Sequence, residues 1–581
     1  MPSSESTPQR ASQEFRLLLS DEWEARMRDD PLFATECGDH RFNDRLPSVS
    51  VEAYEQRLSQ AAGFLARLEA MDRTALPGSD RLDYDIFARI LRDRIADYEF
   101  RAYLMPVTAQ SGFHIFFPDT QNTAPFNTVQ DYEAYLARLV GFKAYAEGHI
   151  ALMRAGMAAG VTAPRIAMVG VEGSLTPHIV TDPADSVFFA PFQAFPATIG
   201  EADRARLQAA AAEAISGSVV PGYQALLGFL TETYIPAARD EIGASALPDG
   251  RAYYEHCVRR YTTLDISPEE VHAIGLSEVQ RIREEMFGII EDVGFVGDLQ
   301  AFLDFLHTEP RFYVDTPEAL LQYVALICKR IDGELPKLFS LLPRTPYGIR
   351  EIPAYAAPRS TTAYYFPCAG DGSRAGHYYV NTYGLGSRPL YEYEALSLHE
   401  AVPGHHLQLA LQMELDLPNF RRFGDVTAFI EGWALYSERL GIEMGFYQDP
   451  YSDFGRLVFG MWRAVRLVVD TGMHALGWTR RQAIDYMAEN TALSLLNITN
   501  EIDRYIGWPG QALAYKMGEL KVSELRERAE SELGAHFDVR DFHRILLEDG
   551  GVPLDLLEAK VVAWIGETLG SGDGRERKHG W

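Results

Sequence analysis

Most of the chain carries apolar residues at the spacing of an amphipathic helix. In residues 51–71, for example, Tyr54, Leu58, Phe64 and Leu68 fall on one face, because side chains three or four positions apart lie together on a helix. The same period predicts helices over residues 11–28, 51–71, 82–98, 129–158, 199–233, 268–293, 299–307, 316–341 and most of the chain from residue 391. The pattern therefore predicts a mainly α-helical fold.

One helix start is marked by its capping residues. Ser267 is a favoured N-cap, Pro268 suits the first helical position, and Glu269 and Glu270 place acids in the first turn, where the helix dipole favours negative charge. We expect a helix to begin at Pro268.

A short stretch before the last third of the chain differs in residue composition. Residues 361–366 and 377–381 are rich in tyrosine, threonine and other strand-forming residues, and they flank a turn signal at Asp371-Gly372. This pattern predicts a small β-ribbon. The ribbon is either an edge that aligns an extended substrate by backbone hydrogen bonds or a purely structural element.

The change of composition near Ile352 also suggests how the chain is divided. We expect a flexible N-terminus over residues 1–12, an N-terminal helical lobe over residues 13–350, a C-terminal lobe with a metal site over residues 351–569, and a flexible tail over residues 570–581.

Composition and charge narrow the classes of function. The chain has 581 residues, 47% of them hydrophobic, and a formal net charge of −28. It is long and apolar enough to bury a large core. The strong negative charge argues against a nucleic-acid partner and against an anionic membrane surface.

Cysteine use and the start of the sequence point to a compartment. The four cysteines are widely separated and form no CxxC pair, and the first fifteen residues are polar. Scattered cysteines are typical of a reducing environment, and a secretory signal needs an apolar segment. Apolar stretches are interrupted before they reach the length of a membrane span. We expect a cytoplasmic protein.

The most informative segment is an apolar run over residues 395–411, which also carries His399, Glu400, His405 and His406. A histidine beside a glutamate on a helix suits a zinc hydrolase, because the imidazole holds the ion and the carboxylate takes a proton from the attacking water. The alternative is a polar patch on a surface helix.

The spacing of these histidines does not suit a regular helix. In the common zinc pattern the second histidine comes four residues after the first, whereas His405 and His406 would lie about 9–10 Å from His399 along a helix axis. Pro403 removes a helical hydrogen bond, and Gly404 tolerates unusual backbone angles. We therefore expect a break at Pro403-Gly404 that returns one of the two imidazoles towards His399.

A catalytic zinc ion needs a third protein ligand. Glu431 is the best candidate, because it lies in an apolar helical segment where an acid needs a metal or another partner. Glu438 is two turns further on the same face, as an orienting partner or a substitute ligand. The alternative for Glu431 is a buried ion pair with an arginine.

Several motifs resemble the bacterial domain-of-unknown-function family 885, and the resemblance covers nearly the whole chain. The motifs are His399-Glu400-x-x-Pro403-Gly404-His405, Glu431-Gly432-Trp433-Ala434 and Tyr505-x-x-x-Pro509-x-Gln511-Ala512-x-x-Tyr515-x-x-Gly518. Members are regarded as zinc metallopeptidase-like proteins. The resemblance implies that His405 is the second ligand. It also implies a fold similar to the carboxypeptidase Taq and thimet oligopeptidase type, with two lobes around a deep central cleft.

Charge that develops on the substrate oxygen needs hydrogen-bond donors besides the metal. Tyrosines serve this role in the helical peptidases that the chain resembles, which favours Tyr505 and Tyr515, followed by His474; the alternative for each is core packing. Three arginines are candidates for a substrate carboxylate, and the sequence does not rank them: Arg374, Arg466 and Arg504.

These observations predict a zinc-dependent hydrolase of peptide bonds in short peptides, with Glu400 as the general base and His399, His405 and Glu431 as ligands of Zn2+. One alternative is a metal-dependent hydrolase of a non-peptide amide or ester, and another is a non-catalytic helical binding protein. We expect a short peptide or small amide as partner, no nucleic acid and no membrane, and a homodimer as a candidate assembly.

Overall fold

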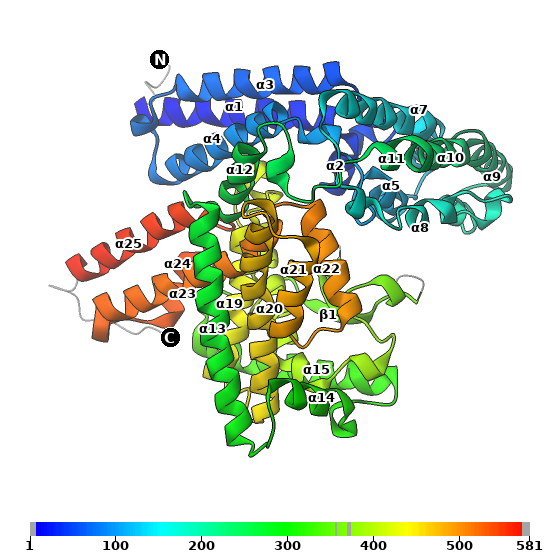
Figure 1. The fold of residues 1–581 in the computed structure, drawn as a ribbon. Coiled ribbons are helices and arrows are strands. Elements are labelled where there is room, and N and C mark those ends of the chain that lie inside the picture. Colours follow the sequence, from blue (N-terminus) through cyan, green and yellow to red (C-terminus); the bar gives the residue numbers. More distant parts are fainter. Residues whose placement is uncertain (1–6, 355–356, 369–373, 572–581) are drawn as a thin grey trace. The chain divides into compact units, whose positions relative to one another are not determined.

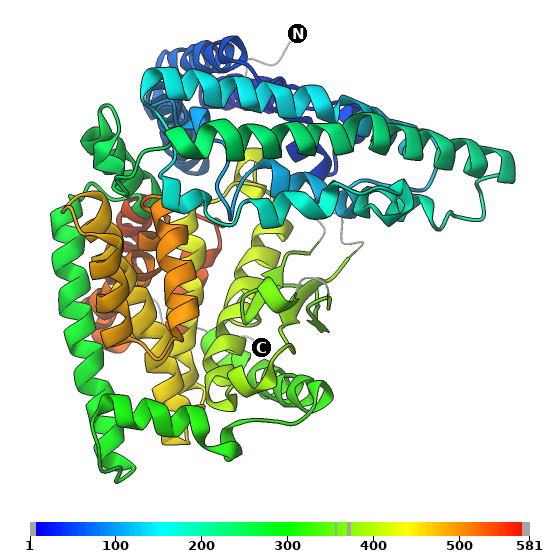
Figure 2. The same ribbon diagram turned by 45° about the vertical axis from the view of Figure 1, so that its right-hand side comes forward.

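A computed structural model describes residues 7–354, 357–368 and 374–571 (Figures 1 and 2). Helices dominate the described residues, and the strands form one small sheet. The predicted mainly α-helical fold class is confirmed.

The chain separates into two compact units, Met1–His256 and Cys257–Trp581. Residues 350 and 351, where a boundary between lobes was expected, both lie inside the second unit, at the end of strand β1 (Tyr347–Glu351). The change of composition at Ile352 thus falls within the sheet region of that unit, directly after β1.

The first unit is built from helices of very different lengths. They are α1 (Thr7–Asp29), α2 (Pro31–Glu36), α3 (Val51–Glu69), α4 (Gly78–Glu99), α5 (Phe113–Phe116), α6 (Thr120–Thr123), α7 (Val129–Ala159), α8 (Glu172–Leu175), α9 (Glu201–Ala214), α10 (Val220–Phe229), α11 (Ile235–Ala237) and α12 (Gly250–Thr262), which continues into the second unit. Two π-helical turns, Ile215–Val219 and Leu230–Tyr234, interrupt the run predicted as helical over residues 199–233.

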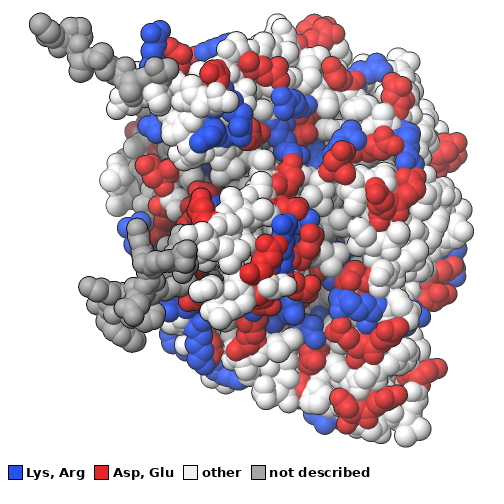
Figure 3. Space-filling model, turned by 90° about the vertical axis from the view of Figure 1, so that its left-hand side faces the viewer, with Lys and Arg blue, Asp and Glu red and all other residues white. Residues whose placement is uncertain are grey.

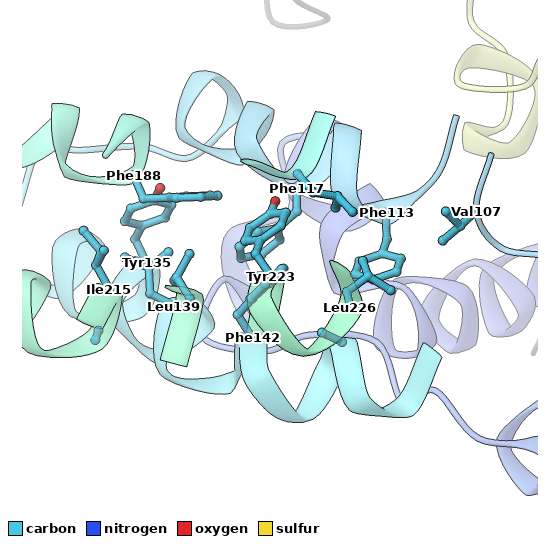
Figure 4. Packing of buried hydrophobic residues seen from close by; sticks show 14 of the residues in the cluster. Val107, Phe113, Phe117, Tyr135, Leu139, Phe142, Phe188, Ile215, Tyr223 and Leu226 are labelled. Atoms are coloured by element: carbon cyan, nitrogen blue, oxygen red, sulfur yellow. The ribbon is translucent and has the colours of Figure 1, made fainter. Parts of the chain in front are cut away.

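Aromatic side chains form the core of the first unit (Figure 4). Phe142 on α7 lies between Phe117 and Tyr223, with ring centroids 4.6 and 4.7 Å away. Gly222 makes this contact possible, since a Cβ there would lie 2.8 Å from Phe142 Cδ1. His114 is fully buried beside this core, next to Phe113.

The second unit holds the remaining helices. They are α13 (Pro268–Asp292), α14 (Leu299–Thr308), α15 (Pro317–Leu338), α16 (Tyr393–Glu400), α17 (His405–Glu414), α18 (Asn419–Arg422), α19 (Thr427–Glu443), α20 (Pro450–His474), α21 (Arg480–Asn490), α22 (Leu495–Gly507), α23 (Ala514–Leu533), α24 (Val539–Leu547) and α25 (Leu554–Ser571).

Helices α13 and α20 run side by side through this unit (Figures 1 and 2). Gly275 lets them approach closely, because a Cβ at that position would lie 2.7 Å from Leu467 Cβ. The predicted start of α13 is confirmed. Ser267 Oγ accepts a hydrogen bond from the Glu270 N–H at 3.2 Å, and the Glu270 carboxylate accepts one from the Ser267 N–H at 2.9 Å.

The predicted β-ribbon is present as β2 (Ala363–Phe366) and β3 (Gly376–Val380), which pair antiparallel. Its expected turn at Asp371-Gly372 lies outside the described residues. Strand β1, which was not predicted, pairs parallel with β3 and gives the sheet order β1-β3-β2. Strand β2 is therefore an edge strand of the sheet that the described residues form.

Acidic and basic side chains are interspersed on the face shown in Figure 3, without a large area of one sign. Among residues 7–354, 357–368 and 374–571, no helix combines the length and the apolar character that crossing a membrane requires.

Candidate metal centre

The predicted break in the motif helix is present. Helix α16 ends at Glu400 and α17 begins at His405, and the turn between them includes a cis peptide bond before Pro403. Gly404 lies against the end of α16, where a Cβ would meet the His399 carbonyl oxygen at 1.9 Å. Only glycine fits this approach, which places His405 beside His399, with ring centroids 4.7 Å apart.

Three predicted ligands meet at this break. Glu431 Oε2 on α19 lies 3.7 Å from His399 Nε2 and 3.6 Å from His405 Nε2. One possible ligand atom from each residue lies within 4.8 Å of the others. Both imidazoles are buried, and Glu431 Oε2 is a buried atom without a hydrogen-bond partner.

These separations fit a tetrahedral ion. Bonds of about 2.0 Å in tetrahedral geometry place neighbouring ligand atoms about 3.3 Å apart, close to the two distances from Glu431. Both distances are too long for hydrogen bonds. Two imidazole nitrogens and one carboxylate are also a donor set that zinc accepts in catalytic sites. The residues therefore fit the ion that the sequence predicts.

Glu438 orients one of the imidazoles. His399 Nδ1 lies 2.8 Å from Glu438 Oε1, which leaves Nε2 directed at Glu431. Burial opposes protonation of His399, but Glu431 and Glu438 raise its pKa to about 9. Burial likewise opposes ionisation of Glu431, but the contact with His399 lowers the pKa of this carboxyl to about 2. The carboxylate is thus held in the ionised form that binds a cation.

His406 points away from the centre, although it follows His405 directly. Its Nδ1 lies 2.9 Å from Tyr365 Oη and its Nε2 lies 3.1 Å from the Thr345 carbonyl oxygen. Both ring nitrogens are therefore engaged with the sheet region. Of the two histidines that residue spacing left open, the structure brings His405 to the centre.

Glu400 lies next to His399 and is buried. Burial raises the pKa of its carboxyl to about 7, while the charge of Arg463 and the backbone N–H of Tyr365 act in the opposite direction. Tyr365 is on the edge strand β2. The carboxyl therefore lies between the candidate metal ligands and a strand that has a free edge.

Helices α19 and α23 pack backbone to backbone beside Glu431. A Cβ on Gly432 would lie 2.4 Å from Gly518 Cα. Tyr515 is one turn before Gly518, and burial together with the charge of Glu431 raises the pKa of its hydroxyl. The predicted Tyr515 thus lies on the helix that packs against the one carrying Glu431.

Tyr505 lies in a network of its own. Its hydroxyl donates to Glu501 Oε2 at 2.6 Å and accepts from Arg466 Nε at 2.7 Å. Arg504 also pairs with Glu501, at 3.0 Å. His474 Nε2 lies 3.0 Å from the Tyr505 carbonyl oxygen. The structure therefore brings these four predicted residues together, with the Tyr505 hydroxyl already bonded on both sides.

Arg374 lies elsewhere on the sheet. Its side chain is exposed, donates to the Pro367 carbonyl oxygen at 2.8 Å and lies over the Phe366 ring. None of its recorded contacts in the described part of the chain involves a residue of the centre.

One residue of the site was missed from the sequence. Arg463 on α20 is 7% exposed, and its charge acts on Glu400, Glu431 and His405. The available signal was a charged residue within the apolar run 457–469. A charge in an apolar helical segment needs a partner, which is the reasoning that selected Glu431.

Two solved structures are similar to the chain. One is titled "putative lipoprotein from Colwellia psychrerythraea", with 29% identity, a TM-score of 0.90, and coverage of 97% of this chain and 100% of that one. The other, a "putative lipoprotein of unknown function from Shewanella oneidensis", has 18% identity, a TM-score of 0.74, and coverage of 94% and 99%.

The chain matches none of the curated proteins. The family model described as "Bacterial protein of unknown function (DUF885)" matches residues 31–561. The chain therefore belongs to the DUF885 family of bacterial proteins.

Proposed function

We propose that the protein is a zinc-dependent hydrolase of peptide bonds in short peptides. The observation that carries this proposal is the position of Glu431 Oε2, 3.6 and 3.7 Å from two imidazole nitrogens and without a hydrogen-bond partner in the described part of the chain. A buried carboxylate oxygen is costly to leave unpaired, and a divalent cation in this position would compensate it. His399, His405 and Glu431 would hold the ion.

A zinc ion in such a site supplies Lewis acidity towards a substrate carbonyl and makes a water molecule more acidic. Glu400 then accepts a proton from the attacking water and passes it to the nitrogen of the leaving amine. Burial raises the pKa of the Glu400 carboxyl towards neutral pH, which suits a group that must both accept and release a proton. In this proposal the Tyr515 hydroxyl, whose pKa burial and the charge of Glu431 raise, would donate to the oxygen on which charge develops.

The edge strand supports a peptide as the substrate. The Asn381 N–H donates to the Thr362 carbonyl oxygen at 3.0 Å, so this pair is hydrogen-bonded across the ribbon. Because bonded and non-bonded pairs alternate in an antiparallel ladder, the backbone groups of Ala363 and Tyr365 turn to the free edge. An extended peptide would pair with this edge next to Glu400.

Metal analysis and mass spectrometry of a peptide mixture test the proposal. We expect purified protein to retain about one zinc ion per chain and to hydrolyse short peptides. Glu400→Gln should keep the metal and slow hydrolysis by about 100-fold or more. Glu489→Gln, an exposed change of the same kind, should cleave at the native rate.

Either of two results would contradict the proposal: the absence of zinc after reconstitution, or native rates in Glu400→Gln. Hydrolysis of amides or esters but not peptides would instead favour the alternative metal hydrolase.

The cellular location and the oligomeric state of the protein are separate proposals. The sequence favours the cytoplasm, whereas the two similar structures carry the name lipoprotein, so cell fractionation is the appropriate measurement. Light scattering of the purified protein tests the proposed homodimer.

A further inference from the structure

Arg463 is a buried cation whose hydrogen-bonding groups are not satisfied within the described residues. Among residues 7–354, 357–368 and 374–571, its Nε and Nη1 atoms are inaccessible to solvent and have no hydrogen-bond partner. Its guanidinium lies over the rings of Phe459 and Trp462, at 4.9 and 4.8 Å from their centroids. Aromatic faces stabilise a cation but do not replace an anionic hydrogen-bond acceptor.

A second guanidinium lies one helical turn further on. Arg466 Nη1 is also buried and has no hydrogen-bond partner among the residues that the structure describes. Arg466 and Arg504 share a single carboxylate, that of Glu501, so this cluster carries more positive than negative charge. The two neighbouring arginines on α20 therefore both offer free N–H groups.

These groups lie beside the candidate metal centre. The Arg466 guanidinium is 4.4 Å from the centroid of the Tyr515 ring, and Tyr515 is one turn from the contact between Gly518 and Gly432, the neighbour of Glu431. Arg463 acts electrostatically on both Glu400 and Glu431. An anion bound to these arginines would lie close to the reacting groups.

We propose that Arg463, together with the free Nη1 of Arg466, binds the terminal carboxylate of the substrate. This inference rests on the proposed hydrolase function and deepens it, because it selects peptides with a free C-terminus. Guanidinium groups bind carboxylates through strong charge-assisted hydrogen bonds. A ligand without this negative charge would leave the buried guanidinium groups unpaired and would therefore bind more weakly.

The position of the carboxylate determines what is released. With the C-terminus at Arg463, the bond presented to Glu400 lies close to the end of the peptide. One water molecule adds to the carbonyl carbon, the C–N bond breaks, and the departing amine takes a proton. The products are a shortened peptide acid and a C-terminal amino acid or short fragment. The reaction class is therefore that of an exopeptidase.

Binding to the slow variant tests this inference without requiring turnover. The probes are two acetylated peptides of one sequence, with a free C-terminus or a C-terminal amide, titrated calorimetrically into zinc-loaded Glu400→Gln protein. We expect the free acid to bind about 10-fold more tightly or better. In the double variant with Arg463→Met this preference should fall to near unity, while zinc content is unchanged.

Two further variants keep the result interpretable. Arg463→Lys retains the positive charge and should keep part of the preference for the free acid. This variant still tests the inference if Arg463→Met does not fold. Arg481→Met removes an exposed arginine whose side chain is 82% accessible, and it should leave the ratio unchanged. Equal binding of acid and amide, or full preference in Arg463→Met, would overturn the inference. Zinc-dependent cleavage of both peptides in that case would leave the hydrolase proposal standing.

Discussion

Gly432 on α19 and Gly518 on α23 touch through their backbones, since a Cβ built on Gly432 would lie 2.4 Å from Gly518 Cα. This contact places the backbone next to Glu431 against the helix that carries Tyr515. No side chain can be accommodated between the two helices without separating them.

Gly432→Ala should therefore be strongly destabilising. Inserting a methyl group into a rigid contact costs about 1–3 kcal/mol, and here the colliding atoms are backbone. Gly288→Ala is the matched control, because Gly288 lies within α13 with no atom within 4 Å of the added Cβ. The control should be neutral or more stable, since alanine is the better helix former. Urea unfolding of both variants measures the difference, and equal stabilities would contradict the packing argument.

The two adjacent histidines should differ in their effect on the metal. His405→Ala removes a proposed ligand and should abolish retention of zinc after dialysis. His406→Ala should keep the ion and lose only the contacts with Tyr365 and Thr345, which lowers stability by about 1–3 kcal/mol. Elemental analysis and thermal unfolding of the two variants separate these outcomes. The reverse pattern would assign the ligand to His406.

Glu438→Gln should weaken zinc binding without unfolding the protein. The amide preserves shape and an acceptor for His399 but removes the charge that fixes the imidazole. Loss of such an orienting group reduces metal affinity by about 10- to 100-fold. Competition with a chelator of known affinity measures the change, and the exposed Glu489→Gln variant serves as control. Native affinity in Glu438→Gln would show that His399 is held by packing alone.

Stability should fall in mild acid because of buried histidines in the first unit. His149 stacks on Phe113 with centroids 3.9 Å apart, and neither of its ring nitrogens has a hydrogen-bond partner within the described residues. Burial, with a contribution from His114, lowers the pKa of His149 to about 3. An unfolded histidine has a pKa of about 6.5, so between these values the unfolded state binds the additional proton. Stability is therefore retained above pH 6.5 and lost as the pH falls below it, by about 1.4 kcal/mol per pH unit for this group.

His149→Phe preserves the stacked ring and removes the titrating group. Urea unfolding at several pH values from 7.5 to 5 should show a shallower decline for this variant than for the native protein. The same substitution at the exposed His536 should leave the slope unchanged. A native slope in His149→Phe would mean that this imidazole is accessible to protons in the fold.

Much of the helical architecture could be predicted because it depends on local signals. The capping residues Ser267 and Glu270 interact only with their own helix, and the break at Gly404 follows from proline and glycine chemistry. Strand β1 could not be predicted in the same way. Its partner is β3, some thirty residues further along the chain, and its residues Tyr-Gly-Ile-Arg-Glu carry no clear alternation.

The candidate site could be predicted as far as residue type and spacing determine chemistry. His399, Glu400 and Glu431 are identified by unusual polar groups in apolar helices. The direction of a side chain is not contained in such a pattern, so Arg466 was selected from the sequence and Arg463, three residues before it, was missed. Tyr505 illustrates the same limit, because a hydroxyl that sequence offers as a free donor is bonded to Glu501 in the fold.

His405 and His406 are adjacent in the chain but point in opposite directions, one to the candidate metal centre and the other to the sheet region. If His405 holds the proposed zinc ion, loosening of strand β2, which carries Tyr365, should also weaken the hold of His405 on that ion. Amide hydrogen exchange in β2 and β3 should consequently slow when zinc is added. The exchange rate of the strand that would bind the substrate backbone would then report whether the buried site holds a cation.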